Sequence, residues 1–248
     1  MEWHAIHEAV LRHVVRIETQ DGTGTGFLFG YNRNNSMAAV ATAAHVVGHA
    51  HLWRQPFRLI HHATQSEVFL PYDRRIVFID HGRDSASIMV RASELPFELE
   101  PLSLIDSTHY IKVGVEVAWM GFPSVAYPEL CFFRGCVSAY LEQRRSYLVD
   151  GVAINGVSGG PVFVSYDGLA PELIGTVSSY LPNRSGGTPG LLLAQDISAF
   201  HDNLQTVRSF EEAKEKEREA QQRAVAEGQV VPEPENQQQN PEERPDRG

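Results

Sequence analysis

A serine surrounded by glycines offers the clearest chemistry in this sequence. In INGVSGGPVF, residues 154–163, three glycines flank Ser158, and a hydrophobic run begins directly after them. Glycine reaches backbone angles that other residues avoid, so this concentration indicates a turn of unusual shape. A hydroxyl group presented by such a turn becomes a nucleophile when a neighbouring base removes its proton. Ser158 is therefore a candidate nucleophile.

The base that activates a serine at neutral pH is most often an imidazole held by a carboxylate. Of the eleven histidines, His45 is the most distinctive, because it follows the small-residue run AAVATAA and precedes VVG. Asp84 lies in the polar loop DHGRDSA, directly before the apolar run SIMV. Alone, His45 is also typical of a partly buried structural residue and Asp84 of a loop cap. Together with Ser158 they favour a catalytic site.

The composition indicates a globular protein with a substantial core. The chain has 248 residues, of which 42% are hydrophobic, and a formal net charge of −10. A negative field repels nucleic acids and anionic membranes, so we expect neither as a partner. No apolar stretch is as long as the roughly 18 residues that a membrane-spanning helix needs. The N-terminus lacks a basic region followed by an unbroken apolar segment, so we expect no secretory signal and a cytoplasmic location.

The two cysteines are not expected to form a disulfide. Cys131 and Cys136 are five residues apart in one predicted strand, which places them on opposite faces and roughly 16 Å apart at about 3.3 Å per residue. A disulfide needs Cα atoms about 5.5 Å apart. We predict two free thiols, which suits a reducing compartment.

The order of hydrophobic patterns predicts an all-β protein with helices at both ends. Residues 2–11 have apolar residues at near-helical spacing, so we expect a short helix within residues 1–12. About a dozen short apolar or alternating runs follow, separated by turn residues. They favour two six-stranded antiparallel β-barrels of the chymotrypsin-like kind, over residues 13–100 and 101–200. The break is expected near residues 95–110.

The C-terminal part has a different composition. Residues 201–228 are rich in alternating charge and predict a solvated helix supported by glutamate–lysine pairs. Residues 229–248 contain proline, glutamine and charge with few apolar residues, and predict a disordered tail. The helix and tail are either a plain solvated extension or a site for a protein partner.

The sequence resembles the trypsin-like (chymotrypsin-fold) serine peptidases, and among them the disulfide-free bacterial HtrA-like branch. The resemblance runs from about Val14 to Phe200. It rests on GTGTGFLFG at 22–30, ATAAHVV at 41–47, RDSASIMV at 83–90, VGVEVAWMGFP at 113–123, GVSGGPVF at 156–163, LIGTVSSY at 173–180 and PGLLLAQDI at 189–197. It implies a serine endopeptidase acting on a protein or peptide substrate.

The resemblance also implies a role for each candidate residue. Ser158 would be the nucleophile, His45 the general base and then the acid, and Asp84 the group that orients His45. The N–H groups of Gly156 and Ser158 would form the oxyanion hole. The nearby Asp80 remains an alternative to Asp84, which is preferred because DSA before an apolar strand matches the family's D-x-A pattern.

The resemblance places the floor of the specificity pocket at Val152. Without a carboxylate there, a bound arginine or lysine would be buried unpaired. We therefore expect cleavage after small or medium apolar residues. The other expected pocket residues are Ala153, Val177, Ser178, Tyr180 and Gly190.

The sequence departs from the family pattern at two positions next to the triad. Val157 replaces the acidic residue that in trypsin precedes the serine and pairs with a freed N-terminus, so we expect no zymogen cleavage of that kind. Val46 replaces the cysteine that follows the catalytic histidine in the family.

No PDZ module is expected after Phe200. Trypsin-like folds that have lost catalysis serve as binding modules, so a silent binding or adaptor module is the alternative function.

Other motifs are weaker. HVVGHAH offers His45, His49 and His51 at spacings that a metal could use, but there is no HExxH motif, and GTGTG lacks the lysine of a phosphate loop. GVSGG also fits the G-x-S-x-G elbow of α/β-hydrolases, which need alternating strands and helices and a histidine after the serine. The only later histidine, His201, lies in the expected C-terminal helix. We predict no metal and no cofactor.

Overall fold

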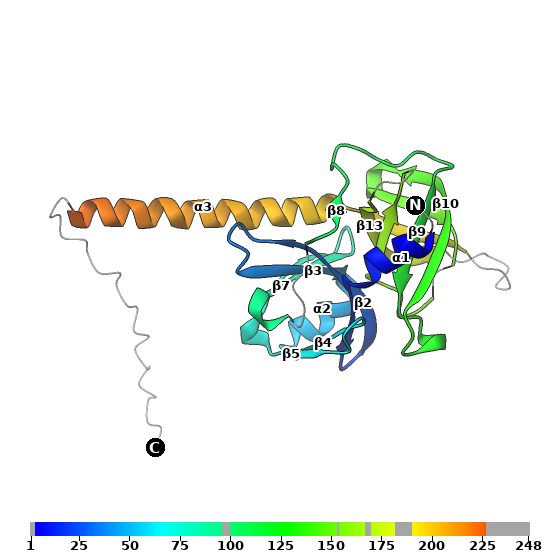
Figure 1. Cartoon of the computed structure of the whole chain (residues 1–248), viewed down its shortest axis with the longest axis horizontal. Helices are drawn as coiled ribbons and strands as arrows, with labels where there is room; N and C mark the ends of the chain where they lie inside the picture. Colours follow the sequence, from blue (N-terminus) through cyan, green and yellow to red (C-terminus); the bar gives the residue numbers. More distant parts are fainter. Residues whose placement is uncertain (1–2, 96–99, 153, 167–169, 182–189, 227–248) are drawn as a thin grey trace, which may run out of the picture. The chain divides into compact units, whose positions relative to one another are not determined.

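The strands of this protein form two sheets (Figure 1). The structure is a computed structural model that describes residues 3–95, 100–152, 154–166, 170–181 and 190–226. Residues 1–208 form one compact unit, and residues 209–248 form a second. The two sheets belong to the first unit.

The predicted N-terminal helix is confirmed as α1, Trp3–Leu11. Its apolar face is buried through Ile6 and Val10, as the near-helical spacing of these residues requires. At its start, the Trp3 ring lies 5.8 Å from the ring of Phe132 in the second sheet. The helix therefore packs its apolar stripe against the body of the protein.

The first sheet has the strand order β5-β4-β1-β2-β3-β7-β6. Helix α2, Ala44–Leu52, follows β3, and two short 3-10 helices, η1 (Tyr72–Arg74) and η2 (Ala92–Glu94), lie at the ends of strands. The strands are β1 (Val14–Thr19), β2 (Gly22–Tyr31), β3 (Met37–Ala43), β4 (Phe57–His61), β5 (Glu67–Leu70), β6 (Ile76–Asp80) and β7 (Ser85–Arg91).

The second sheet has the order β12-β9-β10-β11-β14-β13-β8, and β12 also pairs with β13. That extra pairing closes six strands into a barrel and leaves β8 outside it. The strands are β8 (Ser103–Leu104), β9 (Glu116–Gly121), β10 (Cys131–Leu141), β11 (Ser146–Asp150), β12 (Pro161–Val164), β13 (Glu172–Leu181) and β14 (Leu191–Asp196), with 3-10 helices η3 (Ser124–Ala126) and η4 (Glu142–Arg144) between them.

The predicted all-β class with two chymotrypsin-like halves is confirmed, with two differences in detail. The first sheet has seven strands and stays open, because no pairing among the described residues joins β5 to β6. Both edge strands are short, four and five residues, which limits the hydrogen bonds that closure would add. In addition, β8 pairs with β13 in the parallel direction. The first sheet ends at Arg91 and the second begins at Ser103, an interval that overlaps the break expected near residues 95–110 but starts four residues before it.

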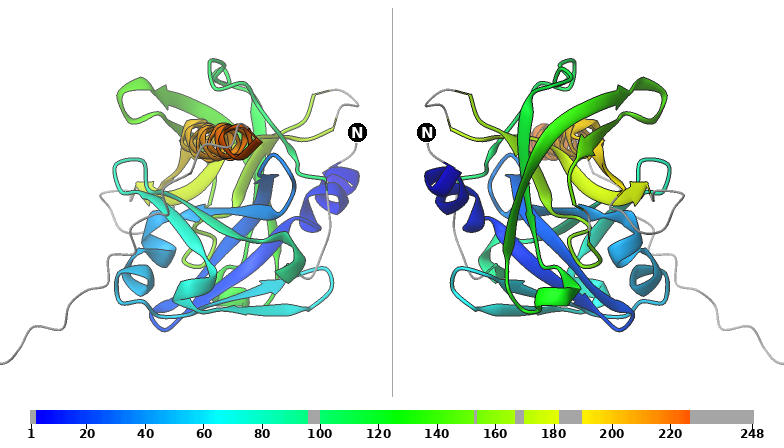
Figure 2. Two further views of the ribbon diagram at one scale, coloured as in Figure 1. Left: turned by 90° about the vertical axis from the view of Figure 1, so that its left-hand side faces the viewer. Right: turned by 90° about the vertical axis from the view of Figure 1, so that its right-hand side faces the viewer.

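The core joins the two sheets. In Figure 2 most of the blue and cyan first sheet lies below the green and yellow second sheet, and one long green strand of the second sheet runs down beside the first. Large buried side chains from both meet in one cluster, which includes Phe27 and Phe29 from β2, Met120 from β9, Phe163 from β12 and Phe200 from α3. Burying such a side chain contributes about 1.5–3 kcal/mol. This shared cluster fixes one sheet against the other, so residues on facing edges have defined distances.

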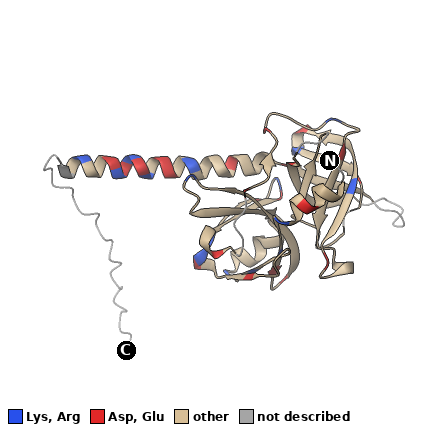
Figure 3. Ribbon diagram, in the orientation of Figure 1, with Lys and Arg blue, Asp and Glu red and all other residues tan. Residues whose placement is uncertain are grey.

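The C-terminal helix is confirmed as α3, Ser198–Ala226, three residues earlier at its start than predicted. Figure 3 shows acidic and basic residues alternating along its C-terminal part. Nearly all described side chains after Arg208 are exposed, as expected for a helix solvated on all sides. The predicted tail at 229–248 lies outside the described residues.

Two further sequence expectations concern cysteines and membrane spans. Cys131 and Cys136 both lie on β10 as free thiols, as predicted. Within the described part of the chain, no helix combines the length and apolar character needed to cross a bilayer.

Candidate active site

His45 and Asp84 meet because β3 and β7 are antiparallel neighbours. Their register pairs Ala43 with Ser85, so the residue after β3 and the residue before β7 lie at the same edge. The Ala44 N–H donates to the Asp84 carbonyl oxygen at 3.1 Å. This places His45, at the start of α2, directly against the Asp84 side chain.

The Asp84 carboxylate holds both the ring and the main chain of His45. The His45 Nδ1 atom lies 3.0 Å from Oδ1 and 2.9 Å from Oδ2, and the His45 N–H donates to Oδ1 at 3.0 Å. Asp84 has a φ of 44°, a left-handed conformation that aspartate tolerates better than most residues. Bonding at Nδ1 leaves the other ring nitrogen, Nε2, free to accept a proton.

Among the described residues, no hydrogen bond or ion pair joins Asp80 to His45. Its carboxylate accepts hydrogen bonds from Arg83, from Nε at 2.6 Å and from the main-chain N–H at 3.0 Å. Arg83 in turn donates to Asp202 at 2.7 Å. The geometry therefore favours Asp84 over Asp80 as the partner of His45.

Ser158 lies on the turn before β12, and packing explains the glycines around it. Gly156 and Gly159 have φ values of +93° and +83°, which side chains rarely adopt. A Cβ at Gly156 would stand 2.2 Å from the Phe122 carbonyl oxygen, and one at Gly159 2.2 Å from that of Thr25. The turn is thus pressed against two other segments of the backbone, and the obstacle at Gly156 is the Phe122 carbonyl.

One cavity holds both His45 and Ser158. Its volume is about 250 Å³, and its lining residues are His45, Ile154, Asn155, Ser158, Val177, Ser178, Ser179 and Tyr180. The Ser158 hydroxyl donates to the Ser178 carbonyl oxygen at 3.3 Å. Among the described residues, no hydrogen bond joins this hydroxyl to His45. Catalytic hydrogen bonds are often long or poorly aligned without substrate, so this geometry is compatible with a nucleophile.

Ser178 was predicted from sequence as a pocket residue, but its hydroxyl contacts Asp84. Ser178 Oγ donates to Asp84 Oδ2 at 2.5 Å. Burial alone would raise the pKa of Asp84, but the hydrogen bonds from His45 and Ser178 outweigh it and hold the pKa below its usual value. Asp84 is therefore kept ionised and fixed from two sides.

Replacing Ser178 with alanine is expected to lower the free energy of unfolding by about 2 kcal/mol at pH 7, because a hydrogen bond to a charged group is lost. A lowered pKa in the folded state stabilises the fold above the unfolded value of about 3.9, and the effect disappears as pH falls through the folded pKa. Urea unfolding of wild type and variant at pH 7 and pH 3 should show the difference shrinking at pH 3. Ser179→Ala, one residue along, is the control, and an equal difference at both pH values would contradict the assignment.

The predicted oxyanion groups lie on the same turn. In the described part of the chain, neither the Gly156 N–H nor the Ser158 N–H donates to a protein acceptor, whereas the Val157 N–H between them donates to Ile154 at 3.1 Å. Two unused amides beside a candidate nucleophile can bind a negatively charged oxygen.

The predicted pocket residues separate into two groups. Val177, Ser178 and Tyr180 line the cavity. Val152, which was predicted as the floor of the pocket, is 40% exposed and does not belong to the described lining of the cavity. Gly190 does not belong to the described lining either. Ala153 lies outside the described residues. Ile154, Asn155 and Ser179 line the cavity although the sequence did not single them out. Their position next to Ser158 or Ser178 in the chain was the available signal.

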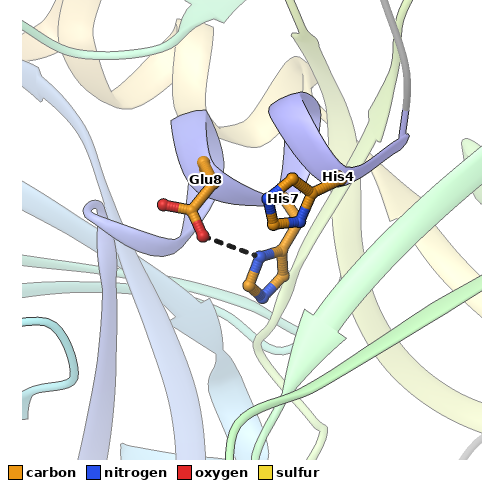
Figure 4. Close-up of side chains that lie close together, drawn as sticks. All are labelled: His4, His7 and Glu8. Carbon is orange, nitrogen blue, oxygen red and sulfur yellow. Dashed lines mark ion pairs between the residues drawn. The ribbon is translucent and has the colours of Figure 1, made fainter.

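A group of possible metal ligands lies on α1. The ligand atoms of His4, His7 and Glu8 all lie within 4.8 Å of one another (Figure 4). His4 and Glu8 are exposed and His7 is half-buried, and His7 Nδ1 is 3.7 Å from the Glu8 carboxylate. In contrast, His49 of the HVVGHAH segment contacts Asp21 at 2.7 Å. The predicted absence of a metal stays a prediction.

The chain matches known proteins in sequence and in fold. The model of the trypsin-like peptidase domain matches residues 24–170, a range that contains His45, Asp84 and Ser158. The crystal structure of Deg5 is 20% identical with a TM-score of 0.60, over 80% of this chain and 90% of that one. The serine endoprotease from Yersinia pestis is 15% identical with a TM-score of 0.62, over 84% of this chain and 67% of that one.

At these identities the two solved structures establish the fold alone. Among curated protein sequences, none matches this chain. The match to the domain model covers more than half of the sequence. The chain belongs to the trypsin-like peptidase domain family.

Proposed function

We propose that this protein is a serine endopeptidase. Ser158 Oγ attacks the carbonyl carbon of a peptide bond while His45 Nε2 takes its proton. His45 then gives that proton to the leaving amine as the C–N bond breaks, and water hydrolyses the resulting ester by the same route. Asp84 holds His45 in the required tautomer and stabilises the imidazolium.

The observation that carries the proposal is the shared cavity of His45 and Ser158, with Asp84 on the far side of the imidazole. His45 Nδ1 contacts the Asp84 carboxylate at 2.9 Å, and His45 and Ser158 line the same 250 Å³ space. A nucleophile, a base and a group that orients the base are the parts that covalent acyl transfer needs. The family match adds support, because peptidases of this family use residues of these types in this order.

The lining of the cavity supports cleavage after small or medium apolar residues. Its described side chains include Ile154 and Val177 and no acidic group. A lysine or arginine of the substrate would therefore lose hydration without gaining an ionic partner. Tyr180 also lines the cavity and narrows the space for a substrate side chain.

Reaction with a fluorophosphonate tests the proposal, because only an activated serine is phosphonylated. We expect the intact mass to rise by one adduct and peptide mapping to place it on Ser158. Ser179→Ala is the matched control, since Ser179 lines the same cavity, and this variant should still react. Absence of an adduct on the wild type would contradict the proposal and favour a silent binding module.

Digestion of a peptide library with the same preparation tests the substrate preference. Cleavage after alanine, valine and residues of similar size is expected, because the cavity offers apolar contacts and no countercharge. A profile dominated by arginine, lysine or glutamate would contradict the preference but not the peptidase activity.

A further inference from the structure

We propose that Thr25 and the main-chain N–H of Ser124 hold the turn around Ser158 in one conformation, and we call their hydrogen bonds the lock. In this conformation the N–H groups of Gly156 and Ser158 point toward the substrate. The inference rests on the proposed peptidase function and names the positioning residues for its oxyanion hole. They lie outside the turn itself, on β2 and on the loop after β9.

The Ser124 N–H sets the direction of the Gly156 amide. It donates to the Asn155 carbonyl oxygen at 2.7 Å. A peptide group is planar and trans, so its N–H points opposite to its C=O. Because Ser124 holds the Asn155 carbonyl, the Gly156 N–H of the same peptide group points the other way. If this peptide rotated by half a turn, the carbonyl oxygen would take the place of the amide and repel a developing negative charge.

The planar trans geometry of the peptide group also fixes the direction of the Ser158 N–H. Its peptide partner, the Val157 carbonyl, accepts the Gly160 N–H at 2.9 Å. Each of the two peptide groups with an unused N–H therefore has its C=O bonded elsewhere. Both amide directions are thus fixed before substrate arrives, as strong electrostatic stabilisation requires.

Thr25 ties the turn to the loop that carries Ser124. Its Oγ1 donates to the Gly156 carbonyl at 2.8 Å and accepts the Phe122 N–H at 3.1 Å. Its own N–H donates to the Ser158 carbonyl at 2.8 Å. One residue thus holds the turn at two carbonyl groups and also holds the neighbouring loop two residues before Ser124.

The Thr25 side of the lock is buried, whereas Ser124 is exposed, and no described ion pair involves Thr25, Ser124 or Val157. Thr25 and Val157 are both 0% exposed, and a Cβ at Gly121 would stand 2.9 Å from Thr25 Oγ1 and 2.8 Å from Val157. A buried hydroxyl with donor and acceptor both satisfied is costly to disrupt. The apolar Val157 therefore needs no charged partner, because hydrogen bonds from Thr25 and Ser124 hold the turn.

The loop that supplies Ser124 is itself anchored to the first sheet. Tyr127 Oη donates to Glu18 at 3.1 Å, and Arg16 donates to the same carboxylate oxygen at 3.1 Å. The Arg16 guanidinium lies over the Tyr127 ring at 4.9 Å. The oxyanion turn in the second half of the molecule is therefore positioned through groups of the first half.

Two pairs of variants separate the lock from general folding. Thr25→Val removes the hydroxyl and keeps the branched shape, whereas Thr25→Ser keeps the hydroxyl. Ser124→Pro removes the N–H, and Ser124→Ala keeps it. The backbone tolerates proline, because Ser124 opens η3 and Pro123 before it has a ψ of 134°, which a following proline allows. The proline ring would also occupy the place of the N–H proton and push the Asn155 carbonyl away, so this variant breaks the contact completely.

We expect Thr25→Val and Ser124→Pro to lower kcat and the rate of phosphonylation by about 10- to 10²-fold, approaching the loss of one oxyanion donor. KM should change little, because the interaction is made in the transition state. Thr25→Ser and Ser124→Ala should stay near wild type. The downfield proton resonance of His45 Nδ1–H should persist in all four variants, since the His45–Asp84 pair is untouched.

The outcomes keep this inference distinct from the proposed function. Equal rates for the wild type, Thr25→Val and Ser124→Pro would overturn the lock and leave the peptidase intact. Loss of the His45 resonance together with the rate would also overturn it, because the variants would then act through the triad. A wild type that does not react at all would contradict the peptidase function itself.

Discussion

Alanine in place of Ser158 is expected to lower kcat for a cleavable peptide by about 10⁶-fold, the effect of removing the nucleophile from a triad that acts as a unit. No neighbour in the turn can replace it, because among residues 154–160 only Ser158 carries a hydroxyl group, and it lines the same cavity as His45. Some acceleration over water should remain, since substrate binding and the amides of the turn are untouched. Single-turnover and steady-state kinetics with the best library peptide measure the effect.

The same substitution should leave the fold intact. The Ser158 hydroxyl makes one described hydrogen bond, to the Ser178 carbonyl at 3.3 Å, and losing such a bond costs about 1 kcal/mol or less. Thermal unfolding of the variant checks this. A folded Ser158→Ala protein that retains activity within tenfold of wild type would contradict the role of Ser158.

Asparagine in place of Asp84 is expected to lower kcat by about 10⁴-fold, the effect known for the carboxylate of a serine protease triad. The carboxylate accepts a hydrogen bond from His45 Nδ1–H, which keeps the proton on Nδ1 and leaves Nε2 unprotonated and able to act as a base. The asparagine amide can donate to Nδ1 instead, which favours the wrong tautomer. Asparagine also tolerates the left-handed backbone at this position, so the test changes the chemistry more than the shape.

Asp80→Asn is the matched control for this experiment. Asp80 lies four residues earlier and pairs with Arg83 at 2.6 Å, so the substitution removes a charge from the same loop without touching His45. We expect Asp80→Asn to retain kcat within about tenfold, a change of about 1.4 kcal/mol or less in the barrier. A larger loss for Asp80→Asn than for Asp84→Asn would reverse the assignment.

Most of the fold class could be read from local patterns. Alternating apolar runs separated by turn residues predicted the strands, and near-helical spacing at Trp3, Ile6 and Val10 predicted α1. Strand pairing could not be read in this way. Whether β12 closes onto β13, and whether β5 meets β6, depends on contacts between residues far apart in the chain.

The sequence by itself determined the types and order of the candidate catalytic residues and the need for glycine around Ser158, because these follow from local chemistry and backbone geometry. Only the tertiary structure decided which groups touch. The register of β3 with β7 brought Asp84, and not Asp80, to His45. Packing between the sheets placed Ser178 on Asp84 and Thr25 on Gly156, across 94 and 131 residues of chain. Hydrogen bonds across such separations have no local pattern, since the intervening fold alone brings their donors and acceptors together.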